Sequence, residues 1–281
     1  MFHLGTPSGS PLTPGVTVFR SEQLLIDRDD HVVTLTMNRP EARNAFGLEM
    51  LAALADAWQM CDDDPTVRAI ILTGAGGHFC AGSDLKAMGQ KQEGELADRF
   101  KQTPNLHWKA LLREFRPKVP VIAAVEGYAL AGGTEILQGT DIRVAGKSAR
   151  FAVAEVKWGL FPLGGSTVRL RRQIGFTRAA EMLLTGRQIS AETAAEWGLI
   201  GRVVEDGQAL EEAKKIAAEI ALCGPLAVQA VKKSLIESDG LTEAEALAQE
   251  LRLGQPIFAT ADAKEGPRAF AEKRKPNFQG K

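Results

Sequence analysis

Two glutamates, Glu135 and Glu155, stand in apolar stretches of the chain and are the side chains best suited to move protons. Glu135 follows a glycine pair in AGGTEIL (131–137), and Glu155 interrupts FAVAEVKWGL (151–160). Burial raises the pKa of a carboxyl group, and a pKa near neutrality suits a general acid or base. The alternative is that both carboxylates are half-exposed and solvated, as most glutamates are. If the fold encloses them, acid–base chemistry is the expected use.

Two glycine-bearing loops could supply the other half of such a site. TGAGGHFCAGSDLK (73–86) and GYALAGGTE (127–135) each accompany a predicted strand. Backbone N–H groups at the start of a helix are unpaired, and two that converge on one point form an oxyanion hole. The alternative is that these glycines serve only tight turns and close packing. The first loop lacks the third glycine of G-x-G-x-x-G, and G-x-x-x-x-G-K-[ST] is absent, so a nucleotide-binding loop is not favoured.

Hydrophobic patterning predicts alternating strands and helices that would position these loops. Strands are expected within 31–40, 67–77, 120–130, 141–146, 148–155 and 199–205, and helices within 46–64, 177–186 and 190–198. Ser190 is a suitable N-cap for the last of these helices. The alternation predicts an α/β fold.

The two ends of the chain differ from this middle part. Residues 1–20 are rich in Gly, Pro, Ser and Thr and are expected to form a flexible leader. From residue 207 onward the pattern is helical, with breaks at Gly224–Pro225 and Gly240. The sequence therefore predicts a core over 21–206 and a C-terminal helical subdomain over 207–281.

The composition excludes several classes of protein. Of 281 residues, 44% are hydrophobic and 25% are charged, which is typical of a soluble globular protein. The net charge of −1 provides no general attraction to nucleic acid or to an anionic membrane. No apolar run approaches the roughly 18 to 20 residues that span a bilayer. The first 20 residues do not resemble a signal peptide, so a cytoplasmic location is expected.

Cysteines and histidines show no pattern of ligands. The three cysteines (Cys61, Cys80 and Cys223) are well separated and are expected to be buried structural thiols. The four histidines are scattered without the spacing of a metal site. No metal site is predicted.

Six motifs, in this order, carry a resemblance that covers the chain from about residue 22 to its end. They are NRPEARNA (38–45), FCAGSDLK (79–86), EGYALAGGTEILQGTD (126–141), FAVAEVKWGLFPLGGSTVRL (151–170), TGRQISAETAAEWGLIGRVV (185–204) and AFAEKRKPNF (269–278). By these motifs the sequence resembles the crotonase, or enoyl-CoA hydratase/isomerase, superfamily, and within it an enoyl-CoA hydratase. The resemblance implies a spiral of ββα units and a C-terminal helical trimerisation region, assembled as a homotrimer or a dimer of trimers.

The resemblance also implies catalytic roles. The thioester oxygen of an acyl-CoA would lie between the N–H groups of Ser83 and Gly132, and the water would be held by Glu135 and Glu155. We expect Glu155 to be the main acid and base and Glu135 to position and activate the water. The glutamate pair favours hydration, because isomerases of the superfamily generally need only the carboxylate that matches Glu155. Isomerase or another acyl-CoA lyase or dehydratase activity remains the alternative, and no cofactor beyond the acyl-CoA substrate is implied.

Substrate recognition is implied at further positions. The residues that match the family's CoA site are Ala42, Arg43, Ala81, Asp84, Leu85 and Lys86, with Phe270 and Lys273 contributed by a neighbouring subunit. Trp158 and Phe161 are candidates for the acyl pocket, although Trp158 could instead be core packing. Short, long and bulky ring-bearing acyl groups all stay open.

Two non-enzymatic alternatives remain. The basic segment KRK (273–275) could bind RNA in a catalytically silent homologue, or it could be a solvated helix end. A structural oligomer could bind CoA without chemistry. The near-neutral net charge weighs against the first, and the two glutamates beside a predicted oxyanion hole weigh against the second.

Overall fold

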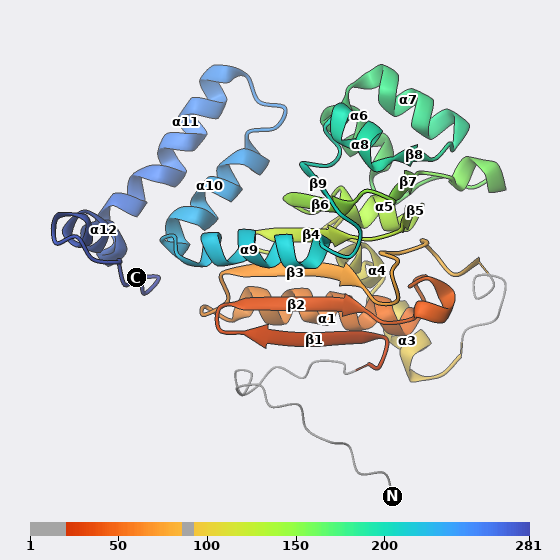
Figure 1. Cartoon of the computed structure of the whole chain (residues 1–281), viewed down its shortest axis with the longest axis horizontal. Coiled ribbons are helices and arrows are strands. Elements are labelled where there is room, and N and C mark those ends of the chain that lie inside the picture. The colour runs from red at the N-terminus through yellow and green to blue at the C-terminus, as the bar shows by residue number, and fades with distance from the viewer. Residues whose placement is uncertain (1–20, 86–92) are drawn as a thin grey trace, which may run out of the picture.

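The computed structural model of the chain describes residues 21–85 and 93–281 and has a six-stranded sheet at its centre (Figure 1). The strand order is β1 (Leu24–Asp29), β2 (Val32–Met37), β3 (Ala69–Gly74), β4 (Val121–Val125), β6 (Ile142–Gly146) and β9 (Arg202–Val204). β1 is antiparallel to β2, and all other neighbours are parallel. The predicted α/β class is confirmed. β1 was not predicted, because its three apolar residues are followed by the charged segment DRD.

Both faces of this sheet are covered, which explains the apolar runs in its strands. In β3, Ile70 and Leu72 pack into the cluster that contains the buried face of α1 (Leu48–Asp63). Ala69 and Ile71 point the opposite way, toward α9 (Ala209–Ala221). Figure 1 shows α1 and α9 on opposite sides of the sheet. The period-two alternation thus assigns each strand residue to one of two cores.

A smaller sheet of three strands contains part of the second glycine loop, 127–135, whereas the first follows β3 of the larger sheet. The order of the smaller sheet is β5 (Tyr128–Leu130), β7 (Arg150–Ala152) and β8 (Ile189–Ser190). The single strand predicted over 120–130 is wrong, since β4 and β5 lie in different sheets. Gly127 separates them with φ of +52°, and a Cβ there would lie 2.3 Å from the Gly77 carbonyl oxygen. The apolar run alone could not reveal this turn.

Short helices lie in the connections between the strands. They are η1 (Pro40–Ala42), α3 (Glu95–Gln102), α4 (Leu106–Ala110), α5 (Gly132–Leu137), η2 (Glu155–Trp158), α6 (Ser166–Ile174), α7 (Phe176–Thr185) and α8 (Ala191–Trp197). Ser190 caps α8 by accepting a hydrogen bond from the Thr193 N–H at 3.2 Å, as predicted. α6 was not predicted, because the polar and charged residues that make up most of STVRLRRQI hide the apolar spacing.

The C-terminal helices project away from the sheet (Figure 1). They are α10 (Pro225–Glu237), α11 (Glu243–Gly254), η3 (Gln255–Ala259) and α12 (Ala261–Ala271), and the predicted breaks at 224–225 and 240 are confirmed. Buried Lys232 ties α10 to the core, because its Nζ donates to the Val119 carbonyl at 2.8 Å and to Asp141 Oδ2 at 2.6 Å. The division at residue 206 stays a prediction; α9 lies after it in sequence but packs on the sheet.

No helix in the described part of the chain is long and apolar enough to cross a membrane. The predicted cytoplasmic location stays a prediction. The predicted leader, residues 1–20, lies outside the described residues.

Candidate active site

Backbone hydrogen bonds join the loop before α5 to the loop after β3. Cys80 N–H donates to the Tyr128 carbonyl at 2.8 Å, and Leu130 N–H donates to the Cys80 carbonyl at 2.9 Å. A Cβ at Gly133 would lie 2.2 Å from the Cys80 carbonyl oxygen, so only glycine permits this approach. A Cβ at Gly82 would lie 3.0 Å from Gly132 N. The glycines therefore serve close packing, and that packing brings the Gly82–Ser83 segment against the start of α5.

Two backbone N–H groups in this junction have no hydrogen-bond partner among the residues that the structure describes. Ser83 pairs with Phe46 through an isolated bridge whose bonds run from Phe46 N–H to the Gly82 carbonyl and from Asp84 N–H to the Phe46 carbonyl. The N–H of Ser83 therefore takes no part in this bridge. Neither this N–H nor that of Gly132 has a hydrogen-bond partner among the residues described. Ala131, just before Gly132, has φ of +49°, a strained conformation of the kind that clusters at functional sites. The arrangement fits a pair of oxyanion donors.

Glu135 is buried one turn into α5, with only 4% of its surface exposed. Burial raises the pKa of its carboxyl group, and hydrogen bonds from Ser166 and Gly164, together with the charge of Arg113, oppose that rise. The Ser166 N–H lies 3.3 Å from Glu135 Oε1. A Cβ at Gly164 would lie 2.5 Å from Glu135 Oε2, so glycine leaves room for the carboxylate.

Glu155 is the first residue of η2 and is half-buried. Burial, and secondarily the neighbouring charge of Glu135, raise its pKa to about 7. Its Oε2 is buried and has no hydrogen-bond partner in the described structure. The two carboxyl groups therefore interact electrostatically. They differ because Glu135 accepts hydrogen bonds from Ser166 and Gly164, whereas Glu155 accepts none from another described residue. Two carboxyl groups that interact in this way disfavour the ionisation of both at once, which suits a pair that exchanges protons with a substrate.

Most of the predicted CoA-binding residues lie together beside this junction. Ala81 N–H donates to the Arg43 carbonyl at 2.9 Å, which joins the Ala42–Arg43 turn to the second loop. The Arg39 guanidinium pairs with Asp84 at 3.2 Å. Leu85 is 47% exposed, and Lys86 lies outside the described residues. The structure brings these main-chain segments together, with Arg43 placed over the Tyr128 ring at 5.3 Å.

Phe270 and Lys273 are not brought to this site within one chain. Both are exposed at the end of α12, which projects on the far side of the molecule from α5 (Figure 1). In the basic segment 273–275, Arg274 forms ion pairs with Glu265 at 2.5 Å and with Glu272 at 2.6 Å. This position suits contact with another copy of the chain.

The two predicted acyl-pocket aromatics are exposed. Trp158 is 69% exposed, so the alternative that it packs in the core is wrong. Phe161 is 64% exposed and borders a cavity of about 240 Å³ together with Arg113 and Leu163. Both side chains follow Glu155 closely in sequence and stand at the surface near it.

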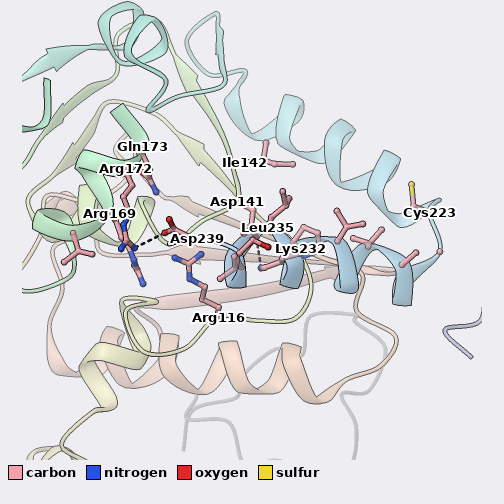
Figure 2. Close-up of a pocket in the computed structure, with 18 residues that line it drawn as sticks. Arg116, Asp141, Ile142, Arg169, Arg172, Gln173, Cys223, Lys232, Leu235 and Asp239 are labelled. Carbon is pink, nitrogen blue, oxygen red and sulfur yellow. Dashed lines mark hydrogen bonds and ion pairs between the residues drawn. The ribbon is translucent and has the colours of Figure 1, made fainter. Parts of the chain in front are cut away.

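A second cavity, of about 960 Å³, lies along α10 and α6 and is bordered by neither glutamate (Figure 2). Figure 2 shows Arg116, Arg169 and Arg172 at one end and Leu235 beside Lys232 on α10. Its lining therefore combines cationic groups with one face of a C-terminal helix.

The thiols and possible metal ligands are unremarkable for catalysis. Cys61 and Cys80 are buried, as predicted, and burial raises the pKa of each thiol to about 12. The prediction for Cys223 is wrong, because it is exposed just after α9, where the helix has left the sheet. Within the described ranges, no group of three or more His, Cys, Asp or Glu is placed to hold a metal ion.

Sequence reasoning missed the residues that surround Glu135. Gly164 and Ser166 lie in the quoted motif FAVAEVKWGLFPLGGSTVRL, but nothing in their spacing connects them to a glutamate about thirty residues earlier. Gln138 was missed because its contact is with Ser166, 28 residues later in the sequence. Only the fold joins these segments.

Comparison with known proteins gives one consistent result. A family model described as "Enoyl-CoA hydratase/isomerase" matches residues 27–281. "Enoyl-CoA hydratase EchA19" of Mycobacterium tuberculosis is 54% identical over 265 residues, which cover 94% of this chain and 99% of that protein. A "2,3-dehydroadipyl-CoA hydratase" of Escherichia coli is 38% identical over 92% of this chain and 99% of its own length.

A solved structure agrees with these sequences. The enoyl-CoA hydratase from Mycobacterium tuberculosis superposes with a TM-score of 0.84 at 39% identity, and the match covers 93% of this chain and 100% of that one. The crotonase-like fold predicted from the motifs is thereby confirmed. This chain belongs to the enoyl-CoA hydratase/isomerase family.

Proposed function

We propose that this protein is an enoyl-CoA hydratase, which reversibly adds water across the trans-2 double bond of an acyl-CoA thioester. The observation that carries the proposal is the pair of interacting glutamates beside two N–H groups that are unpaired within the described ranges. One glutamate is buried and accepts hydrogen bonds, and the pKa of the other is raised to about 7. Membership of the family and the relatives named as hydratases support the same activity.

In the proposed reaction each group has one role. Glu135 accepts a proton from water as the water oxygen bonds to the β-carbon, and the double-bond electrons move toward the thioester carbonyl. The N–H groups of Ser83 and Gly132 stabilise the negative charge that develops on the thioester oxygen. Glu155 donates its proton to the α-carbon. The pair begins and ends with one proton, which lies on Glu155 before hydration and on Glu135 after it, and dehydration starts from the second of these states.

The test is an absorbance assay with a panel of trans-2-enoyl-CoAs that have short, long and ring-bearing acyl groups. Loss of the conjugated enoyl-thioester absorbance with any member would support hydration and identify the acyl class, which the exposed Trp158 and Phe161 leave open. No loss with any of them, while the thioesters still bind, would overturn the hydratase proposal in favour of isomerase or other crotonase chemistry. A non-enzymatic homologue that only binds CoA or RNA would show neither hydration nor isomerisation of an enoyl-CoA.

The pH dependence follows from the shared proton. Because Glu155 must be protonated and Glu135 ionised for hydration, kcat/KM should follow a bell-shaped curve. Glu155 loses its proton as the pH rises through about 7, so activity should fall on the alkaline side of that value. The acid limb should report ionisation of Glu135. A kcat/KM profile that keeps rising to pH 9 would contradict the assignment of Glu155 as the acid.

We also propose that the C-terminal helices make the subunit contacts of a homotrimer or a dimer of trimers. Large apolar side chains are exposed along them, including Leu235 at 75%, Phe258 at 83% and Phe270 at 86%. Exposed apolar groups gathered on one region mark interaction surfaces. The cavity along α10 is lined by one of these exposed side chains, Leu235 (Figure 2). Such an assembly would allow Phe270 and Lys273 to reach a neighbour's CoA site, and sedimentation equilibrium would distinguish three subunits from six.

A further inference from the structure

One buried hydroxyl group ties the first turn of α5 to two strands of the smaller sheet. Thr134 is fully buried and lies between Gly132 and Glu135 in the chain. Its Oγ1 lies 2.5 Å from the Ala129 carbonyl oxygen of β5 and 2.9 Å from the Ala152 carbonyl oxygen of β7. A hydroxyl has one hydrogen, so the two carbonyl oxygens share it. The proposed reaction does not use this side chain.

The direction of these hydrogen bonds is unusual for a threonine in a helix. A serine or threonine hydroxyl in a helix generally bonds to a carbonyl three or four residues earlier in the same helix. Both acceptors of Thr134 lie outside α5, one of them five residues earlier in the chain and the other 18 residues later. The hydroxyl therefore joins separate elements and contributes nothing to the hydrogen bonding within the helix.

The Ala152 carbonyl also holds the strained residue that precedes α5. Ala131 N–H donates to it at 2.7 Å, and the Ala131 carbonyl accepts from the N–H groups of Thr134 at 2.9 Å and of Glu135 at 3.0 Å. The φ of +49° at Ala131 is unfavourable for a residue with a Cβ and persists only where the surrounding contacts enforce it. This conformation sets the direction of the next N–H group along the chain, which is that of Gly132. Hydrogen bonds from both sides of this proposed oxyanion donor therefore converge on one carbonyl of β7.

The strand β7 leads directly to the other glutamate. Ala152 is the last residue of β7, and Glu155 begins η2 three residues later. Val153, which lies between them, is buried. A shift of α5 relative to the end of β7 would therefore move the Gly132 N–H and the Glu135 carboxyl group relative to Glu155.

We propose that Thr134 is a positioning residue whose hydroxyl holds the Gly132 N–H and the Glu135 carboxyl group in place relative to Glu155. The proposal rests on the hydratase function above and deepens it. Thr134 does not act on the substrate, because its hydroxyl is buried and bonds to two main-chain carbonyls. Hydration needs the thioester oxygen and the water to be aligned at once, and a misplacement of about 1 Å can lower a rate by about 10²-fold.

The decisive substitution is Thr134→Val, which keeps the branched shape of the side chain and removes the hydroxyl. In the full-length chain, kcat for hydration of a trans-2-enoyl-CoA should fall by about ten- to a hundred-fold. KM should stay within about two-fold, because the hydroxyl bonds to neither of the main-chain segments proposed to bind CoA. Both parameters are measured well below the midpoint of thermal denaturation of each variant, so that only folded protein is compared.

Thr134→Ser separates the position of the helix from the stability of the fold. Serine keeps the hydroxyl but loses the methyl group, which leaves a small cavity at a buried site. The midpoint of thermal denaturation should therefore fall, whereas kcat should stay within about three-fold of the original value. A purely stabilising hydroxyl would instead leave kcat unchanged in both variants as long as they are folded.

Thr140→Val is the matched control, because it makes the same chemical change at another buried threonine. Thr140 is 3% exposed and lies beyond the C-terminal end of α5. Its Oγ1 donates to the Leu137 carbonyl at 2.7 Å and accepts from Arg143 Nε at 3.4 Å. Neither bond connects α5 with β5 or β7, so kcat should stay within about two-fold of the original value.

Unchanged kcat in a folded Thr134→Val protein, or equal losses in the valine and serine variants, would overturn the positioning role and leave the hydratase function intact. Absence of hydration by the unmodified protein would instead overturn the proposed function, and the positioning role with it. If Thr134→Val does not fold, Thr134→Ala is compared with Thr134→Ser, since both lack the methyl group and differ only in the hydroxyl. A lower kcat in the alanine variant would then support the positioning role, and an equal kcat would contradict it.

Discussion

Glu155→Gln is expected to lower kcat for hydration by about 10³-fold, within the range of about 10²–10⁴ for loss of a general acid or base. Glutamine has nearly the same shape as glutamic acid but has no transferable proton for the α-carbon. The oxyanion donors of Ser83 and Gly132 are untouched, so KM should stay within a few-fold of the original value. Steady-state kinetics near pH 7 would measure both parameters.

At alkaline pH the Glu155→Gln variant should be more stable than the unmodified protein. A loss of activity in this variant could then not be explained by a loss of folding. The pKa of Glu155 is raised from its ordinary value to about 7, so the native state disfavours its ionisation. Above pH 7 the ionised carboxylate therefore destabilises the fold, and below about pH 4 this penalty is absent. Because Glu155 is only half-buried, we expect a gain of about 1–2 kcal/mol in the free energy of unfolding at pH 8. Near-normal turnover in a folded Glu155→Gln protein would contradict the mechanism.

Ser83→Pro is expected to lower kcat by about 10²- to 10³-fold, the usual effect of losing one oxyanion donor. Proline lacks the N–H that we assign to the thioester oxygen. Since the bridge to Phe46 uses the Gly82 carbonyl and the Asp84 N–H, the substitution breaks no backbone hydrogen bond in the described structure. Enoyl-CoA hydration by the purified variant would show the loss.

Ser83→Ala is the matched control for this donor. Alanine retains the backbone N–H and removes only an exposed hydroxyl, so its kcat should lie within about two- to three-fold of the original, as is usual for surface side chains. Thermal denaturation of both variants would establish that they are folded. An equal loss of kcat in the alanine and proline variants would assign the effect to the hydroxyl group and would contradict the role of the main-chain N–H.

The sequence was most informative where a local pattern reports a local structure. The alternation in β2, the helical spacing in α1 and the serine cap of α8 were all predicted correctly, because each depends on nearby residues. The separation of β4 from β5 was not, since it depends on a turn at Gly127 that packs against Gly77. Hydrophobic patterning predicted only an α/β class, and the more specific crotonase-like spiral was implied by the ordered motifs alone.

The candidate site shows the same limit. Glu135 and Glu155 stood out because a carboxylate in an apolar stretch is unusual, and the fold does place them in mutual interaction. Ser166 and Gln138 did not stand out, because a serine and a glutamine carry no such contrast. Their relation to Glu135 exists only once α6 packs against α5, about thirty residues away in sequence.

The position of α9 in the chain has a consequence for synthesis on the ribosome. The second face of the sheet, formed by residues such as Ala69, Ile122 and Val144, is buried by Ala213 and Ile216 of α9. All strands of this sheet except β9 end by Gly146, so they leave the ribosome well before this helix does, and a large apolar surface stays open while the chain is still growing. Surfaces of this kind attract chaperones and other unfinished chains. A nascent chain that stalls near residue 206 would have every strand of the sheet and still be unable to bury it.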